Sequence, residues 1–134
     1  VQLEEAEGEN KPKGSSKVLI KEVLEHANRF YQFYLLHTLE GHAALDYLYS
    51  RGIDLEFIRT FELGFAPKAL HLRSLMQEQK IPLSLLEEAG LMVRDREFFS
   101  DRITIPIRDA VGAVIGFSAR KYKAETFGGK YVNT

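Results

Sequence analysis

A chain of 134 residues, 45% apolar and 28% charged, has the size and composition of one globular domain, and no apolar run approaches the roughly 18 residues of a membrane-spanning helix. The absence of cysteine excludes disulfides and thiolate metal sites and is compatible with a reducing cytoplasm, where we expect the protein to act. The net charge is −1, but residues 1–10 carry −4 and residues 101–134 carry +3, so the C-terminal quarter is basic.

The stretch before the first predicted helix is acidic and has little apolar periodicity. It contains Pro12 and Gly14, and we interpret residues 1–16 as a linker or frayed arm that follows something upstream. Ser15 or Ser16 suits the N-cap of the helix that comes next. Residues 17–134 are then expected to form the folded domain.

Helical periodicity dominates the next part of the sequence. From Lys17 to about Leu39, apolar residues recur every three or four positions, which predicts one long amphipathic helix that Gly41 ends. Further helices are predicted over residues 42–50, 54–61, 69–79 and 84–89.

Capping residues and glycines delimit these shorter helices. Asp54 and Ser84 are expected to be N-caps, and Gly52 and Gly90 suit the left-handed conformation that closes a helix. The segment LGFAP, residues 63–67, is too short for a helix and stops at a proline, so we expect a brief strand there.

The last third of the chain is predicted to be antiparallel β structure. Residues 91–99 suit a hairpin around Arg94, and residues 101–120 suit a stronger one in which Gly112 supplies the left-handed loop residue. The predicted fold is therefore α+β, with a helical N-terminal half packed on a small, mostly antiparallel sheet that has a C-terminal β-hairpin. If Asp109 lies opposite Ala113, strict alternation gives the second hairpin a core face of Ile103, Ile105, Ile107, Ile115, Phe117 and Ala119.

The same alternation predicts an outward face that is small, polar and positively charged. Arg102 is expected opposite Arg120, and Arg108 opposite Val114, with no acid in the hairpin to offset them apart from the aspartates at its ends. Because two arginines that face each other across a strand pair repel, this face is expected to meet an anionic partner.

Sites of other kinds have little support in the sequence. The four histidines lack the i, i+4 spacing of a helical metal site, and neither a phosphate-binding glycine loop nor a nucleophile motif is present. Acidic residues such as Glu87, Asp101 and Asp109 are more typical of turns and ion pairs than of magnesium ligands. No metal site is expected in this chain.

Basic and aromatic residues are interleaved after the hairpin. Such a pattern combines charges for phosphates with rings on which bases can stack. An ordinary solvated strand end is the alternative, and composition alone does not decide between them. The residues concerned are Arg120, Lys121, Tyr122, Lys123, Lys130 and Tyr131.

Four short stretches, taken in order, resemble the bacterial replicative DNA primase family, and specifically the N-terminal part of its RNA-polymerase core. The family's YLxxRG helix end is matched by YLYSRG, its GFAP segment by GFAP, its RxxFPIRDxxGxxIGFGGR hairpin by RITIPIRDAVGAVIGFSAR, and its PKYLNSPET stretch by GGKYVNT. The resemblance runs from about Leu19 to the last residue. Ser118 and Ala119 stand where the family usually has two glycines.

The resemblance implies an activity and a division of labour. Family members are DNA-directed RNA polymerases that make short RNA primers on single-stranded DNA, with Zn²⁺ in an upstream zinc-ribbon domain and Mg²⁺ in a downstream Toprim domain. The segment between them supplies basic residues that hold the template, the primer and the incoming NTP, so this chain is expected to be a fragment that ends before the Toprim domain and is inactive alone. By motif, the binding roles fall on Arg102, Arg108, Arg120, Lys130, Tyr131 and Asn133.

The resemblance also implies partners. Single-stranded DNA, the RNA primer and NTPs would touch this segment, whereas the replicative helicase and the single-strand-binding protein would be met through other domains. The alternative, from another functional class, is a protein-interaction module without a nucleic-acid role. In that case an exposed sheet edge, or the helix that carries Phe30, Tyr31, Phe33 and Tyr34, would dock a partner.

Overall fold

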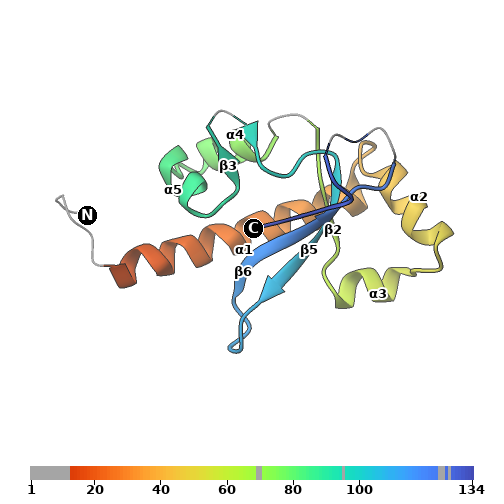
Figure 1. Ribbon diagram of the computed structural model, residues 1–134, viewed down its shortest axis with the longest axis horizontal. Helices are drawn as coiled ribbons and strands as arrows, with labels where there is room; N and C mark the ends of the chain where they lie inside the picture. The colour runs from red at the N-terminus through yellow and green to blue at the C-terminus, as the bar shows by residue number, and fades with distance from the viewer. Residues whose placement is uncertain (1–12, 69–70, 95, 124–125, 127) are drawn as a thin grey trace.

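A long helix and an antiparallel sheet organise the molecule, and the predicted α+β class is confirmed. The computed structural model describes residues 13–68, 71–94, 96–123, 126 and 128–134. Helix α1 runs through the middle, with the short helices α4 and α5 along one side and the long hairpin on another (Figure 1). The helices are α1 (Lys13–His37), α2 (His42–Ser50), α3 (Leu55–Thr60), α4 (His71–Glu78) and α5 (Leu83–Glu88); the strands are β2 (Gly64–Ala66), β3 (Met92–Val93), β4 (Arg96–Glu97), β5 (Arg102–Arg108), β6 (Val114–Arg120) and β7 (Tyr131–Asn133).

The apolar stripe predicted for the first helix is confirmed, but both of its ends differ from the prediction. Helix α1 begins at Lys13, so the expected N-cap at Ser15 or Ser16 is wrong, and residues 13–16, predicted as linker, are helical. Lys13 follows a proline in the sequence, and proline fits the first turn of a helix but not its interior. The helix ends at His37, and Gly41 instead precedes α2 at its N-cap position. Linker residues 1–12 lie outside the described residues.

The shorter helices follow their local signals, with one exception. The Asp54 carboxylate accepts a hydrogen bond from the Phe57 amide at 2.9 Å, which confirms the predicted N-cap of α3. Gly52 and Gly90 have φ of +83° and +81°, as expected of residues that close helices. The cap predicted at Ser84 is wrong, because α5 begins one residue earlier, after Pro82. Proline has the extended backbone that an N-cap needs, so Ser84 becomes part of the first turn.

The larger sheet has the strand order β2-β5-β6-β7, with every neighbouring pair antiparallel. The brief strand at the LGFAP segment and both hairpins are confirmed. Strand β7 was not predicted. It pairs with β6 through Ser118 and Asn133, Ala119 and Val132, and Arg120 and Tyr131.

The register of the long hairpin differs from the predicted one by one residue, because of a bulge. Asp109 and Ala113 close the loop as expected, and Arg108 pairs with Val114. Beyond that point the register shifts, so Ile107 pairs with Gly116 and Ile115 is left without a partner in the ladder. Since the side-chain period of a strand is two, this shift changes which β6 residues share a face with each residue of β5.

The two faces of the sheet are therefore composed differently from the prediction. Helix α1 covers the face that carries Phe117, whose ring centroid lies 5.3 Å from that of Tyr31. The other face carries Ile103 and is covered at one end by apolar residues of α2 and α3. Ile107 and Ile115, predicted to be core, are exposed because the apolar residues of α2 and α3 pack against Ile103 and Ile105 and not against the loop end of the hairpin.

Candidate nucleic-acid interface

Arg120 lies on the sheet face opposite α1, beside two aromatic rings. It ends β6 and pairs with Ile103 of β5 on one side and with Tyr131 of β7 on the other. Its guanidinium carbon lies 5.6 Å from the ring centroid of Tyr47 and 5.7 Å from that of Tyr131. Both distances are within the range of cation–π attraction. Two rings therefore hold the guanidinium at the surface.

The hydrogen-bonding capacity of Arg120 is not used up by the protein. Its Nε atom is buried and has no hydrogen-bond partner, and no acidic side chain among the described residues forms a salt bridge with it. Buried donors are nearly always paired in native proteins, so one without a partner needs an explanation. The residue as a whole is only half-buried, so an anion at the surface could accept charge-assisted hydrogen bonds from this guanidinium.

Two residues of this site were not predicted, Tyr47 and Arg51. They lie one turn apart on α2 and at its end, where the Arg51 guanidinium carbon is 5.2 Å from the Tyr47 ring centroid. Their i, i+4 spacing puts them on one helix face, a signal that could have been read from YLYSRG. We call the set Tyr47, Arg51, Arg120 and Tyr131 the Arg120 surface.

Strand β7 adds an aromatic and a polar side chain to the same face of the sheet. Tyr131, which is 52% exposed, is directly opposite Arg120, and Asn133 is directly opposite Ser118. The side chain of Lys130, the residue before the strand, is exposed. Four of the six predicted binding residues, Arg120, Lys130, Tyr131 and Asn133, are thus brought together at one end of the sheet.

Arg102 does not lie on this face, and its predicted position opposite Arg120 is wrong. The bulge puts Ile103 there instead, and Arg102 is 3% exposed on the α1 side of the sheet. Its Nη1 donates to the carbonyl of Lys130 at 3.3 Å and to that of Ala119 at 3.5 Å. Burial lowers the pKa of Arg102, an effect that neighbouring Asp101 opposes.

Arg108 is exposed, but its charge is neutralised within the protein. Its guanidinium forms salt bridges with Glu62 and, at 3.1 Å, with Glu25 of α1, and it also donates to the carbonyl of Gly112. Hydrogen bonding to Glu62 raises the pKa of Arg108. The prediction that no acid offsets the charge of Arg108 took only the residues of the hairpin into account. The two acids that pair with it, Glu25 and Glu62, lie elsewhere in the fold.

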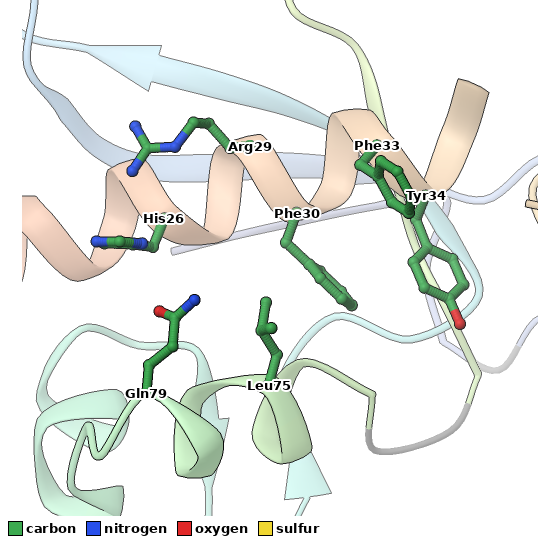
Figure 2. Close-up of a pocket in the computed structure, with 7 residues that line it drawn as sticks. All are labelled: His26, Arg29, Phe30, Phe33, Tyr34, Leu75 and Gln79. Carbon is green, nitrogen blue, oxygen red and sulfur yellow. The ribbon is translucent and has the colours of Figure 1, made fainter. Parts of the chain in front are cut away.

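A separate hollow of about 330 Å³ lies between α1 and α4, and none of the residues of the Arg120 surface lines it. In Figure 2, Phe30 of α1 points toward Leu75 of α4 and toward Gln79, which directly follows α4, whereas the guanidinium of Arg29 points away from α4. The hollow is lined mostly by apolar atoms and contains no carboxylate. It does not extend the cationic site.

The described residues offer neither a metal cluster nor a membrane-spanning helix. No group of three or more His, Asp or Glu side chains within them lies close enough together to hold a metal ion. No helix in the same part of the chain combines the length and apolarity needed to cross a bilayer.

Comparison with known proteins identifies relatives along nearly the whole chain. The family model described as DNA primase catalytic core, N-terminal domain, matches residues 30–134. The DNA primase of Chlamydia trachomatis is 42% identical over 119 residues, which cover 89% of this chain and 20% of that protein. The chain thus spans about a fifth of that relative's length.

Solved structures agree with the sequence comparison. The RNA polymerase domain of Mycobacterium tuberculosis primase, in complex with a double-stranded DNA oligomer with a 6-nucleotide overhang, is similar with a TM-score of 0.81 and 32% identity, over 87% of this chain and 38% of that one. A primase catalytic domain bound to single-stranded DNA is similar with a TM-score of 0.77 and 29% identity, over 90% of this chain and 38% of that one.

Proposed function

This chain belongs to the family of N-terminal domains of the DNA primase catalytic core, and from that membership we propose that it works as part of a DNA primase. Such an enzyme makes short RNA primers on single-stranded DNA during replication, which places it in the bacterial cytoplasm. The segment holds the template–primer and the incoming NTP, and it does not catalyse nucleotidyl transfer by itself.

The observation that carries the proposal is Arg120 with its unused hydrogen-bonding capacity between two tyrosine rings. A guanidinium of this kind suits a phosphate oxygen, because it forms charge-assisted hydrogen bonds and stays charged at all physiological pH values. The exposed ring of Tyr131 suits stacking of a base next to that phosphate. Phosphate contact and base stacking together are what single-stranded nucleic acid requires.

The six binding residues predicted from the family motif are proposed to play two different roles. Arg120, Lys130, Tyr131 and Asn133 are proposed to contact nucleic acid or nucleotide, with Tyr47 and Arg51 beside them. Arg102 and Arg108 are proposed to act through the protein, since the first is buried and the second is ion-paired.

The metals of primase chemistry are proposed to be held outside this segment. Magnesium prefers carboxylate oxygens, and the described residues offer no carboxylate cluster, nor a histidine cluster for zinc. Phosphoryl transfer depends on positioning and on metal ions that neutralise charge. The chain therefore supplies positioning, and contacts with the helicase and the single-strand-binding protein are proposed to lie in other parts of the enzyme.

Primer synthesis by the complete primase that contains this segment tests the proposal. We expect Arg120→Ala or Lys130→Ala to reduce primer yield severely, by about tenfold or more, because each removes a contact made during the reaction. Arg96→Ala is the matched control, since Arg96 is an exposed cation on the small β3–β4 hairpin. Normal synthesis by both variants would count against the assigned role, provided that their circular dichroism spectra and melting temperatures match the wild type.

A further inference from the structure

Two neighbouring buried residues, Asp101 and Arg102, contact the connection between β6 and β7. Asp101 directly precedes β5 and is 7% exposed, and Arg102 is the first residue of β5 and is 3% exposed. Of this connection, residues 121–130, the structure describes 121–123, 126 and 128–130. The connection ends with Lys130 and leads directly into Tyr131, the first residue of β7.

Arg102 holds the C-terminal end of the connection. Its Nη1 donates to the carbonyl of Lys130 at 3.3 Å, and the same carbonyl accepts from the Lys121 amide at 3.1 Å. A methyl group on Gly128 would lie 3.0 Å from Nη2 of Arg102, so the backbone approaches the guanidinium closely. The Arg102 guanidinium thus fixes the backbone at Lys130.

Asp101 holds the N-terminal end of the connection. Its carboxylate accepts from the Tyr122 hydroxyl at 2.9 Å and from the Thr126 hydroxyl at 3.4 Å, and it forms a salt bridge with Lys123 at 3.2 Å. The backbone of Asp101 is in the left-handed region, with φ of +58°, and its amide donates to the carbonyl of Ala66 at 2.7 Å. The aspartate is therefore fixed to β2 while its side chain holds the connection.

The connection is also tied to the Arg120 surface by aromatic contacts. The ring of Tyr122 lies 5.8 Å from that of Phe65 and 6.4 Å from that of Tyr47, with both pairs edge-on. A shift of the connection would therefore move Tyr122 against Tyr47, one of the two rings that flank Arg120. The contacts that fix the connection therefore also shape the Arg120 surface.

We infer that Asp101 and Arg102 are positioning residues that fix the described residues of the connection and strand β7 in the place where Lys130 and Tyr131 can meet nucleic acid. The inference rests on the proposed function for its consequence in binding, and on the hydrogen bonds above for its structural part. It replaces the expectation that Arg102 contacts the nucleic acid directly. A buried guanidinium that donates to backbone carbonyls organises a backbone, and it cannot reach a phosphate on the far face of the sheet.

Hydrogen exchange of the 134-residue chain, read by NMR without nucleic acid, tests the structural part. In Arg102→Met we expect exchange about tenfold faster at the amides of Lys121 and of residues 131–134, with no change in α1. Asp101→Asn is the second variant, because asparagine tolerates the left-handed conformation and keeps the shape while losing the charge. Its effect should fall on the same amides. Unchanged exchange there, or equal acceleration throughout the chain, overturns the inference.

A double-mutant cycle on single-stranded DNA binding tests how Arg102 acts. If Arg102 works through Lys130 and Tyr131, then Arg102→Met should weaken binding in the wild type but by less than about twofold when both of those residues are alanine. Losses that multiply would mean direct contact and overturn the inference. If the wild type binds no DNA, the proposed function fails, while the exchange experiment still decides whether the two residues hold the connection.

Discussion

The guanidinium carbon of Arg120 lies 5.6 Å from the ring centroid of Tyr47, which joins the end of strand β6 to helix α2. Neither segment forms the Arg120 surface by itself. Helix α2 contributes a ring and a second arginine, β6 contributes the central cation, and β7 contributes the exposed ring. The site is thus a product of the tertiary fold, and its residues should depend on one another.

Removal of the Tyr131 ring is expected to weaken binding of single-stranded DNA. A base stacked on an aromatic side chain contributes about 1–3 kcal/mol, so Tyr131→Ala should reduce affinity by at least about fivefold. Tyr131→Phe keeps the ring and should bind nearly as well as the wild type. Fluorescence anisotropy with a labelled oligonucleotide measures both. Tyr49→Ala, which removes another exposed tyrosine, on α2, is the control, and an equal loss in Tyr49→Ala would contradict a specific role for Tyr131.

Arg108 is expected to contribute to stability rather than to nucleic-acid binding. Because it pairs with Glu25 and Glu62, Arg108→Ala should lower the melting temperature, and the difference from wild type should shrink at high salt. The salt dependence of DNA binding should stay unchanged. Thermal melts at two salt concentrations, together with a binding titration, separate the two roles. A smaller salt dependence of binding in the variant would show that Arg108 meets a phosphate.

Gly64, in the GFAP segment, is expected to be required for packing. A methyl group at this position would lie 2.6 Å from Cβ of Tyr31 and 2.7 Å from its carbonyl carbon, and backbone atoms cannot move aside cheaply. Gly64→Ala should therefore lower the free energy of unfolding by roughly 2–3 kcal/mol. Gly129→Ala is the matched control, because its methyl group would meet its nearest neighbour at an ordinary 3.6 Å. Urea denaturation measures both, and equal stability of the two variants would refute the packing role.

The stability of the fold is expected to fall as pH rises through the range in which Glu97 ionises. Glu97 is 8% exposed beneath the first turn of α4, and burial raises its pKa from 4.5 to about 7, although hydrogen bonds from the amides of Arg73 and Leu72 oppose the shift. A pKa that is higher in the folded state contributes stability that is fully present below pH 4.5 and is lost as pH rises toward 7.

Comparison of the wild type with Glu97→Gln isolates this contribution. The difference in unfolding free energy between the two proteins should change by at most about 3 kcal/mol across the interval, with the wild type losing stability relative to the variant. Urea denaturation at several pH values gives the difference. Parallel profiles for the two proteins would contradict a raised pKa at Glu97.

Local signals predicted most of the fold. The apolar stripe of α1, the cap at Asp54 and the loop at Gly112 were all legible because each depends on residues close together in the sequence. The bulge after Ile107 was not, because strict alternation contains no information about an inserted residue. Because of that one residue in β6, Arg120 lies opposite Ile103, so Arg102 and Arg120 are on different faces of the sheet, and the face of Arg102 is the one that α1 buries.

Part of the candidate site could not be predicted from the sequence, because it depends on contacts between distant segments or on a strand that is very short. Glu25 and Glu62 neutralise Arg108 from elements that are distant along the chain, so a view of the hairpin alone left this arginine unpaired. Strand β7 was missed because three residues carry too little periodicity to indicate a strand. The family motif predicted Lys130, Tyr131 and Asn133 as binding residues, and the pairing of β7 with β6 places Tyr131 beside Arg120 and Asn133 beside Ser118, with Lys130 directly before the strand.

The most direct test of the Arg120 surface is a salt titration of single-stranded DNA binding by the wild type, by Arg120→Ala and by the control Arg96→Ala. We predict weak binding by the wild type that declines linearly on logarithmic axes, and a slope smaller by about 0.7 in Arg120→Ala alone, as expected for one lost phosphate contact. The absence of wild-type binding at low ionic strength, or the same slope in all three proteins, would contradict the account.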